Sequence, residues 1–429
     1  MRAVRMLIAG IAVILPLTAA AQGPIQPASY GYGGGSYGPD PYAYGPGCPY
    51  GPGCNNCGPG GVCPETIYEL LPDDRFHQGD DSCCAAFSSA FQHAYLRLEY
   101  LNWNIDDPGR QLVGAPRASG GERGQFNAFD PNSQQFVGLG ELATLDDVGL
   151  HRNNGIRGVI GLPTRVGLFE AGVSTLEQAG AHIFKEQFFD FNALSQVVPV
   201  VTLLDDGAPS DTTMILFNQG LNVQLQSEFF ATEANFITHP LTPNQGLSIR
   251  PLCGFQYIRF WDTLDIFGTN ISPGADAIDP ADDITLNHRI RSEMKNNLFA
   301  PQVGVRFEFE HEHFSVGCTP KFLLGFNRHR DEVFSEQIFS PTEGRQTTDE
   351  EDSEFAPGLD LSVYGKVHLG KHLSLFASYQ LYYLDNISRA SDNVRYNSIG
   401  GTQPDIVLSP HQEGVFIDGV TVGGEFRFH

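Results

Sequence analysis

Apolar and polar residues alternate with a period of two along about ten stretches of the chain. In the last of these, Val420 and Val422 alternate with Thr421 and Gly423. A period of two places successive side chains on opposite faces of an extended strand. We therefore expect strands with one apolar and one polar face at residues 94–105, 155–162, 166–176, 220–236, 247–261, 297–309, 314–327, 355–369, 373–384 and 415–429.

The connections between these strands alternate between short and long. Residues 163–165 and 370–372 are short turns, whereas residues 106–154 and 385–413 are long connections. This asymmetry is typical of outer-membrane barrels, which have short periplasmic turns and long outer loops, and a soluble β-sandwich gives no reason for it. The sequence therefore predicts an all-β fold, a transmembrane antiparallel up-and-down β-barrel of about ten to twelve strands, over residues 94–429.

The part of the chain before the predicted barrel carries different signals. Arg2 and Arg5 precede an apolar segment too short to span a bilayer, and small residues at 19–21 follow, so residues 1–21 are predicted to be a cleaved signal peptide. Residues 22–64 are rich in Gly, Pro and Tyr and are predicted to be a disordered linker. Residues 65–93 are expected to form a short periplasmic segment. Together these features predict export to the outer membrane.

The formal net charge of -24 narrows the range of partners. Nucleic-acid binding needs a basic surface, so nucleic acid is not expected as a partner. An anionic surface instead suits solubility, divalent cations or cationic partners. The run 349–352 offers carboxylates that suit calcium, but it lacks the fixed spacing and central glycine of a calcium loop. A solvated surface loop is the preferred interpretation.

Six cysteines precede the predicted barrel: Cys48, Cys54, Cys57, Cys63, Cys83 and Cys84. Thiolates at short spacings can bind zinc, but exported cysteines generally pair as disulfides within or between chains. We favour disulfides, which would allow the leader to be cross-linked to its neighbours in the cell envelope. No cofactor and no metal site are predicted.

The terminal strand carries a spacing of its own, in which a polar residue is followed by a glycine and two aromatic residues. These positions are Thr421, Gly423, Phe426 and Phe428. The spacing resembles the C-terminal signal of bacterial outer-membrane barrels, with His429 added after the usual last aromatic residue. The resemblance implies that these four residues are read by the barrel assembly machinery, which would be a partner together with outer-membrane lipid.

Several stretches, in this order along the chain, resemble a family of outer-membrane β-barrel porins common in planctomycetes. The stretches are AYLRLEYLNW (residues 94–103), RGVIGL (157–162), NNLFAPQVGVRFEFE (296–310), KFLLGFNRHR (321–330) and GVTVGGEFRF (419–428). The similarity extends from about Ala94 to the C-terminus. It implies a porin-like outer-membrane protein, and it brings no catalytic residues with it.

If the apolar faces of the strands contact lipid, the polar faces line the lumen. The charged candidates on these faces are balanced in sign: Arg97, Arg157, Arg306, Lys321, Lys366 and Arg427, with Glu99, Glu170, Glu228, Glu308, Asp360 and Glu425. A balanced set suits internal ion pairs, because a buried unpaired charge is costly. Barrels of about eight strands are filled by side chains. A narrow or plugged lumen is therefore preferred over a wide water-filled pore.

These observations predict passive passage of small solutes through a narrow, charge-lined lumen. One alternative is a structural barrel of the cell envelope, cross-linked through its cysteine-rich leader. A barrel enzyme is a further alternative, because some barrels of this size are proteases or phospholipases. The histidines are scattered in or near loops, and no motif links one to a nucleophile or to a pair of aspartates. No catalytic residue is therefore predicted.

Overall fold

The computed structural model describes residues 94–109, 111–115, 126–129, 135–145, 150–164, 166–241, 246–272 and 283–428. The chain divides into two units, Met1–Cys63 and Pro64–His429, and all the described residues belong to the second. The predicted signal peptide, the linker, the short periplasmic segment and the six candidate disulfide cysteines lie outside the described residues.

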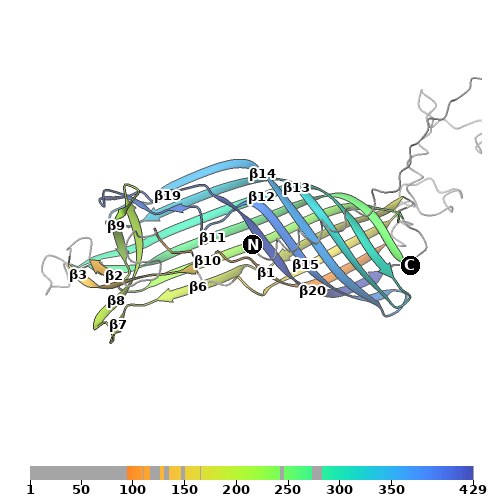
Figure 1. Ribbon diagram of the computed structural model, residues 1–429, viewed down its shortest axis with the longest axis horizontal. Helices are drawn as coiled ribbons and strands as arrows, with labels where there is room; N and C mark the ends of the chain where they lie inside the picture. Colours follow the sequence, from red (N-terminus) through yellow and green to blue (C-terminus); the bar gives the residue numbers. More distant parts are fainter. Residues whose placement is uncertain are drawn as a thin grey trace, which may run out of the picture. The chain divides into compact units, whose positions relative to one another are not determined.

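Ten antiparallel strands close into a barrel (Figure 1). Following the wall from one neighbour to the next, they are β1 (Tyr95–Ile105), β4 (Asn153–Pro163), β5 (Gly167–Leu176), β10 (Leu221–Thr238), β11 (Leu247–Ser272), β12 (Ile284–Glu310), β13 (Phe314–Glu336), β14 (Gln346–His368), β15 (Leu373–Ser388) and β20 (Gln412–Arg427). Each barrel strand pairs with the next one along the chain, and β20 pairs with β1. The predicted up-and-down barrel is confirmed.

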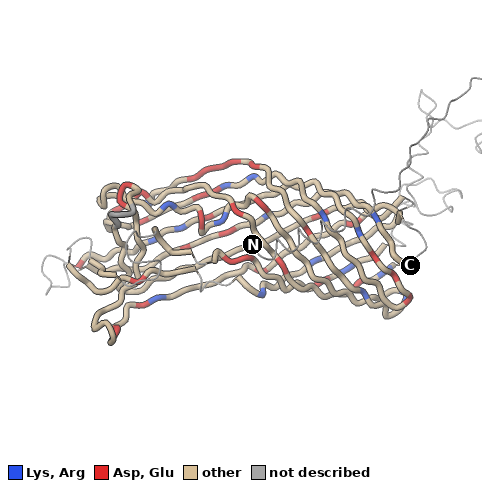
Figure 2. The backbone as a smooth tube through the Cα atoms, in the orientation of Figure 1, with Lys and Arg blue, Asp and Glu red and all other residues tan. Residues whose placement is uncertain are grey.

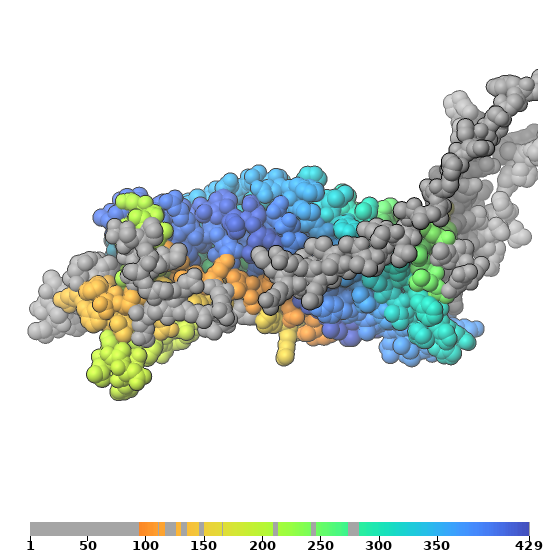
Figure 3. Space-filling view, viewed as in Figure 1, coloured from red at the N-terminus to blue at the C-terminus, as the bar shows by residue number. Residues whose placement is uncertain are grey.

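The first and last barrel strands form the seam. β1 and β20 pair in an unbroken register from Tyr95 opposite Arg427 to Ile105 opposite Ile417. In the space-filling view the orange first strand lies beside the blue strands of the C-terminal third (Figure 3). The seam gives every strand of the wall a neighbour on both sides, as a spanning structure in lipid requires.

The outward face of the barrel carries a band of exposed apolar side chains near the short turns. Leu98, Val303, Phe322, Val367 and Val420 belong to it, each about half exposed. Such a band is the lipid-facing surface of a transmembrane barrel. None of the described residues forms a helix long and apolar enough to cross a membrane.

Two hairpins extend further beyond the band than the sequence predicts. β11 and β12 pair as far as Ser272 and Ile284, and β13 and β14 pair as far as Ser335 and Gln346. Residues 262–296 and 328–354, expected as long loops, therefore lie mostly in strands. In the membrane part of these strands the apolar side chains face outward, whereas in the outer part they face inward. The alternation therefore continues, but the apolar and polar faces are exchanged.

The other long connections form a second sheet at the end of the barrel away from the short turns (Figure 1). Its strands are β2 (Phe126–Phe129), β3 (Phe136–Leu142), β7 (Phe188–Asp190), β8 (Ser195–Asp205), β9 (Ala208–Leu216), β17 (Asn397–Ile399) and β18 (Gln403–Pro404). We call this sheet the cap. Three shorter elements complete the outer part: β6 (Ala179–Lys185) on β10, and β16 (Val394–Arg395) with β19 (Val407–Leu408). The apolar run at residues 195–204 forms most of β8, which pairs with β9.

Candidate functional site

The half of the barrel interior nearer the short turns holds a network of ion pairs. Glu233 of β10 bonds to Arg157 of β4 and to Lys321 of β13, whose Nζ lies 2.7 Å from Glu233 Oε2. The same Nζ lies 2.6 Å from Asp360 Oδ2 on β14. Asp360 lies directly opposite Lys321 on the neighbouring strand. The two pairs of Glu233 join strands that are not neighbours in the wall, so the network crosses the lumen.

A second set of pairs lies in the same half. Arg306 of β12 binds Glu170 of β5 through two parallel bonds, of 3.0 and 2.6 Å. Lys366 Nζ on β14 lies 2.8 Å from Glu425 Oε2 on β20. A bidentate Arg–carboxylate pair is among the strongest charge-assisted contacts in proteins. The lumen in this half is therefore crosslinked by paired charges.

A cavity of about 150 Å³ remains among these pairs. It is bordered by charged side chains of several strands, including Arg97, Glu170 and Lys321. Its lining is polar, and its volume is large enough for several water molecules. We call this half of the interior the charged chamber; Figure 2 shows basic and acidic positions interspersed along its strands.

The predicted lumen residues, with the exception of Glu228, lie on the inward face of their strands. Arg97, Arg157, Glu170, Arg306, Glu308, Lys321, Lys366, Glu425 and Arg427 border the cavity, and Glu99 and Asp360 pair with members of this set. Sequence analysis therefore identified most of the network. It missed Glu233, which binds two of its cations.

The expected inward position of Glu228 is wrong. Its chain neighbours Ser227 and Phe229 are buried on the inward face, so Glu228 points out of the barrel. The reason is the exchange of faces along β10. Leu221, Val223 and Leu225 are buried on the inward face in the outer part of this strand, where no lipid contacts the outward face. The sequence could have identified Glu233, because it lies three residues from Phe236 in the same strand. Since Phe236 faces outward, Glu233 must face inward.

An apolar layer closes the interior above the charged chamber. Its centre is a cluster of Trp103, Phe229 and Tyr382, whose ring centroids lie 5.6 to 6.0 Å apart and which are at most 1% exposed. Trp103 Nε1 donates to Thr421 Oγ1 at 3.1 Å, which satisfies the buried indole nitrogen. All barrel strands except β4 contribute residues to the continuous apolar cluster that contains this layer. This apolar layer therefore separates the charged chamber from the outer part of the barrel.

The apolar cluster continues into the cap. Val201 and Leu203 of β8, together with Leu145 and Phe217 from the connecting segments, belong to the same cluster and are at most 1% exposed. The long connections thus fold onto the barrel mouth and share one core with it. The sequence did not predict the cap, because its sheet is held together by the distant parallel pairings of β8 with β3 and β17.

One buried ion pair lies in this outer part. Arg389 Nε donates to Asp262 Oδ2 at 2.8 Å, and both side chains are at most 1% exposed. Ser227 Oγ donates to Asp262 Oδ1 at 2.5 Å, and the Arg389 guanidinium also donates to the carbonyl of Asp106. This pair ties together β10, β11 and both the first and the last long connections. No sequence pattern identified it, since each residue is a single charge in a predicted loop.

The four predicted assembly residues divide between the two faces of β20. Phe426 and Phe428 point outward, are about half exposed and contact each other with ring centroids 5.2 Å apart. Thr421 faces inward beneath Trp103. Gly423 lies against β1, where a Cβ atom would stand 2.1 Å from the carbonyl oxygen of Leu98. Their recognition by the assembly machinery remains a prediction.

A profile of the family described as Putative beta barrel porin-7 matches residues 95–428, almost the whole of the barrel and its cap. The chain belongs to this family. The resemblance to an outer-membrane porin family, expected from about Ala94 to the C-terminus, is confirmed. No curated protein matches the chain.

Several solved outer-membrane barrels align with most of this chain. The outer-membrane protease OmpT from Escherichia coli is 12% identical with a TM-score of 0.43, covering 79% of this chain and 97% of its own. A FadL homologue from Pseudomonas aeruginosa is 9% identical with a TM-score of 0.24, covering 78% and 90%. The toluene transporter TbuX from Ralstonia pickettii is 9% identical with a TM-score of 0.19, covering 79% and 89%.

Proposed function

We propose that this protein is a closed outer-membrane barrel that holds its folded cap at the outer surface of the cell. The observation that carries the proposal is the apolar layer around Trp103, which lies between the charged chamber and the outside. Opening a path through it would expose large aromatic side chains to water, and each costs about 1.5–3 kcal/mol or more. A resting pore is therefore not favoured by this interior.

The second candidate is the porin-like passage of small solutes. Two observations favour it: the family to which the chain belongs, and the polar cavity of about 150 Å³ in the charged chamber. Passage by this route requires a conformation in which the layer and the cap move aside. An enzymatic role has no comparable support, because the ionisable groups of the charged chamber are held in ion pairs rather than arranged around a free nucleophile.

Conductance across planar lipid bilayers separates the two candidates. We expect the full-length protein to give no stable single-channel steps. Removing the layer in the double variant Trp103→Gly/Phe229→Ala should introduce steps, because the charged chamber would then open toward the outside. The matched control is Phe322→Ala, which removes an aromatic ring from the lipid-facing surface and should remain silent.

Steady steps from the unchanged protein would overturn the closed barrel and favour the porin. Folding of the inserted protein is checked separately on gels, because a folded barrel changes its mobility when it is boiled. A silent double variant that is folded and inserted would mean that the layer is not the barrier, and the barrier would then lie in the cap.

A further inference from the structure

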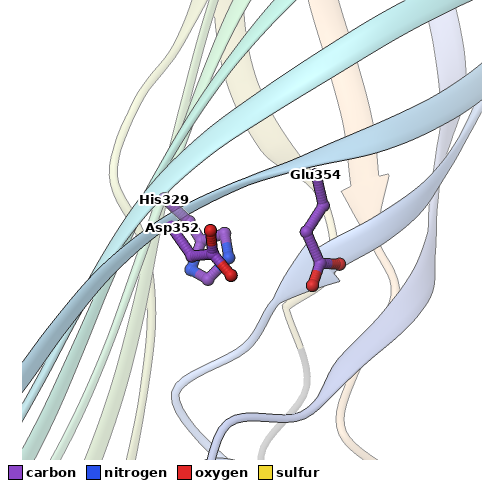
Figure 4. Close-up of side chains that lie close together, drawn as sticks. All are labelled: His329, Asp352 and Glu354. Atoms are coloured by element: carbon purple, nitrogen blue, oxygen red, sulfur yellow. The ribbon is translucent and has the colours of Figure 1, made fainter.

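The hairpin of β13 and β14 places three potential metal ligands on one face. His329 and Asp352 are directly opposite each other across the two strands, and Glu354 follows two positions along β14 on the same face. One ring nitrogen of His329 and one carboxylate oxygen from each acidic residue all lie within 4.8 Å of one another. Figure 4 shows the three side chains directed to the same side of the hairpin.

The imidazole of His329 is held in an orientation that suits a metal ligand. The side chain is 2% exposed, and its Nδ1 lies 2.9 Å from Asp331 Oδ2. Asp331 in turn accepts a bond of 2.8 Å from Ser388 Oγ on β15. A carboxylate on Nδ1 fixes the proton there and leaves the lone pair on Nε2, as in the histidine ligands of metalloproteins. Among the described residues, His329 Nε2 has no hydrogen-bond partner.

Two other acceptor atoms of β13 are also buried without a hydrogen-bond partner within the described residues. Asn327 Oδ1 and Asp331 Oδ1 are buried and have no partner in the described part of the chain. Asn327 Nδ2 is already used, since it donates to Asn296 Oδ1 at 2.8 Å. With His329, these residues occupy successive inward positions of β13. Buried lone pairs that lack donors are costly, and a cation is a group that satisfies several of them together.

The two carboxylates can move to complete a site. β15 pairs with β14 only from Gly358 onward, and no strand in the described part of the chain pairs with this edge of β14 at Asp352 or Glu354. Asp352 is exposed and Glu354 is half-buried. Figure 2 shows acidic residues concentrated along this part of β14. Their side chains therefore have the freedom to approach a cation that His329 holds from the buried side.

We propose that His329, Asp352 and Glu354 bind a first-row divalent cation of the Zn²⁺ class at the outer part of the barrel. Imidazole nitrogen favours such cations over calcium and magnesium, and carboxylate oxygens accept them. Three protein ligands leave positions for water, and Asp331 acts as the positioning residue for His329. Bound there, the cation joins β13 to the free edge of β14 and neutralises part of its acidic run.

Zinc titration of the full-length protein tests the site. The protein in detergent is alkylated at any free cysteines, because free thiolates would compete for zinc, and it is stripped with a chelator that is then removed. Calorimetry should show that the unchanged protein binds one Zn²⁺ more than His329→Gln. Asp331→Asn should bind that ion about 10–100-fold more weakly, as expected for loss of the partner that orients a histidine ligand.

The matched control is Glu351→Gln. This residue neighbours Asp352 but pairs with Arg328 on the outward face, so its neutralisation should leave the stoichiometry and the affinity unchanged. Replacing Zn²⁺ by Co²⁺ adds a visible absorption band that should be lost in His329→Gln.

Equal zinc binding by the unchanged protein and His329→Gln would overturn the proposal, and so would absence of binding to both. The latter result would favour a protonated His329 paired with the carboxylates. Because His329 is buried, folding of each variant is checked by gel mobility. If His329→Gln does not fold, the half-buried Glu354→Gln decides, and unchanged affinity in that variant would also reject the site.

Discussion

At the scale of single residues, the barrel uses buried charge in two ways. In the charged chamber, Lys321 has two carboxylate partners and Glu233 has two cationic ones, so the loss of one contact leaves another. In the outer part, Arg389 and Asp262 lie within an apolar cluster as each other's nearest charged partner, and Glu413 lies 3.7 Å from the Arg389 guanidinium. Removing one partner of a buried pair leaves an uncompensated charge, which destabilises the fold.

Arg389→Met should therefore lower the free energy of unfolding by about 3–5 kcal/mol. The additional change Asp262→Leu should recover much of this loss, because the remaining buried charge is removed as well. The control is Arg328→Met, whose pair with Glu351 is largely exposed and contributes at most about 1 kcal/mol. Urea unfolding of the barrel in lipid vesicles measures all three variants. Similar losses for Arg389→Met and Arg328→Met would contradict this account.

At the scale of elements, the membrane-facing parts of the strands could be predicted and the outer parts could not. Lipid forces the apolar face outward, so residues such as Phe322 and Val420 fix the phase of their strands. Beyond the lipid, water reverses the preferred face, and the alternation in β10 no longer tells which side Glu228 occupies. The cap includes the parallel pairing of β3 with β8, two strands far apart in the sequence, which no local pattern reveals.

The seam between β1 and β20 depends on the close approach at Gly423. A Cβ atom there would lie 2.1 Å from Leu98 O and 2.8 Å from the Glu99 Cα, both in the facing strand. Gly423→Ala should therefore displace the backbone at the point of barrel closure, at a cost of about 1–3 kcal/mol or more. The fraction of heat-modifiable, folded protein in the outer membrane should fall.

Gly424→Ala is the control for this prediction. It is the next residue of the same strand, but its Cβ would meet no atom closer than 4.0 Å. The folded fraction should stay near that of the unchanged protein. Equal effects of the two substitutions would show that the glycines matter for a reason other than the close contact with β1.

At the scale of the whole barrel unit, the interior is divided along its length. Near the short turns it is polar and held by ion pairs; beyond the apolar layer it is a hydrophobic core shared with the cap. The sequence predicted the first part, because polar faces opposite lipid must be paired. It could not predict the second, because the core is assembled from connections that are separated by most of the chain length. A contact between the last long connection and β20 responds to pH.

Glu413 and Asp392 form this contact at the outer end of β20, where Asp392 also bonds to Gln111 from the first long connection. Burial and the nearby Asp392 carboxylate raise the pKa of Glu413 to about 7. A raised folded-state pKa means that the protonated form stabilises the fold, so this contribution is complete below the unfolded pKa near 4.5 and is lost as the pH rises through about 7. The cap should therefore loosen between about pH 4.5 and about pH 7, the window set by these two values.

Hydrogen exchange of the connection at residues 389–411 measures this loosening, and we expect faster exchange at the upper end of the window after correction for the intrinsic rate. Glu413→Gln should remove most of the pH dependence, because a neutral amide keeps the hydrogen bond to Asp392 without a titrating proton. Glu332→Gln, a change at a similarly exposed carboxylate that pairs with Arg345, should leave the dependence intact. A pH profile that is the same in Glu413→Gln and in the unchanged protein would place the titrating group elsewhere.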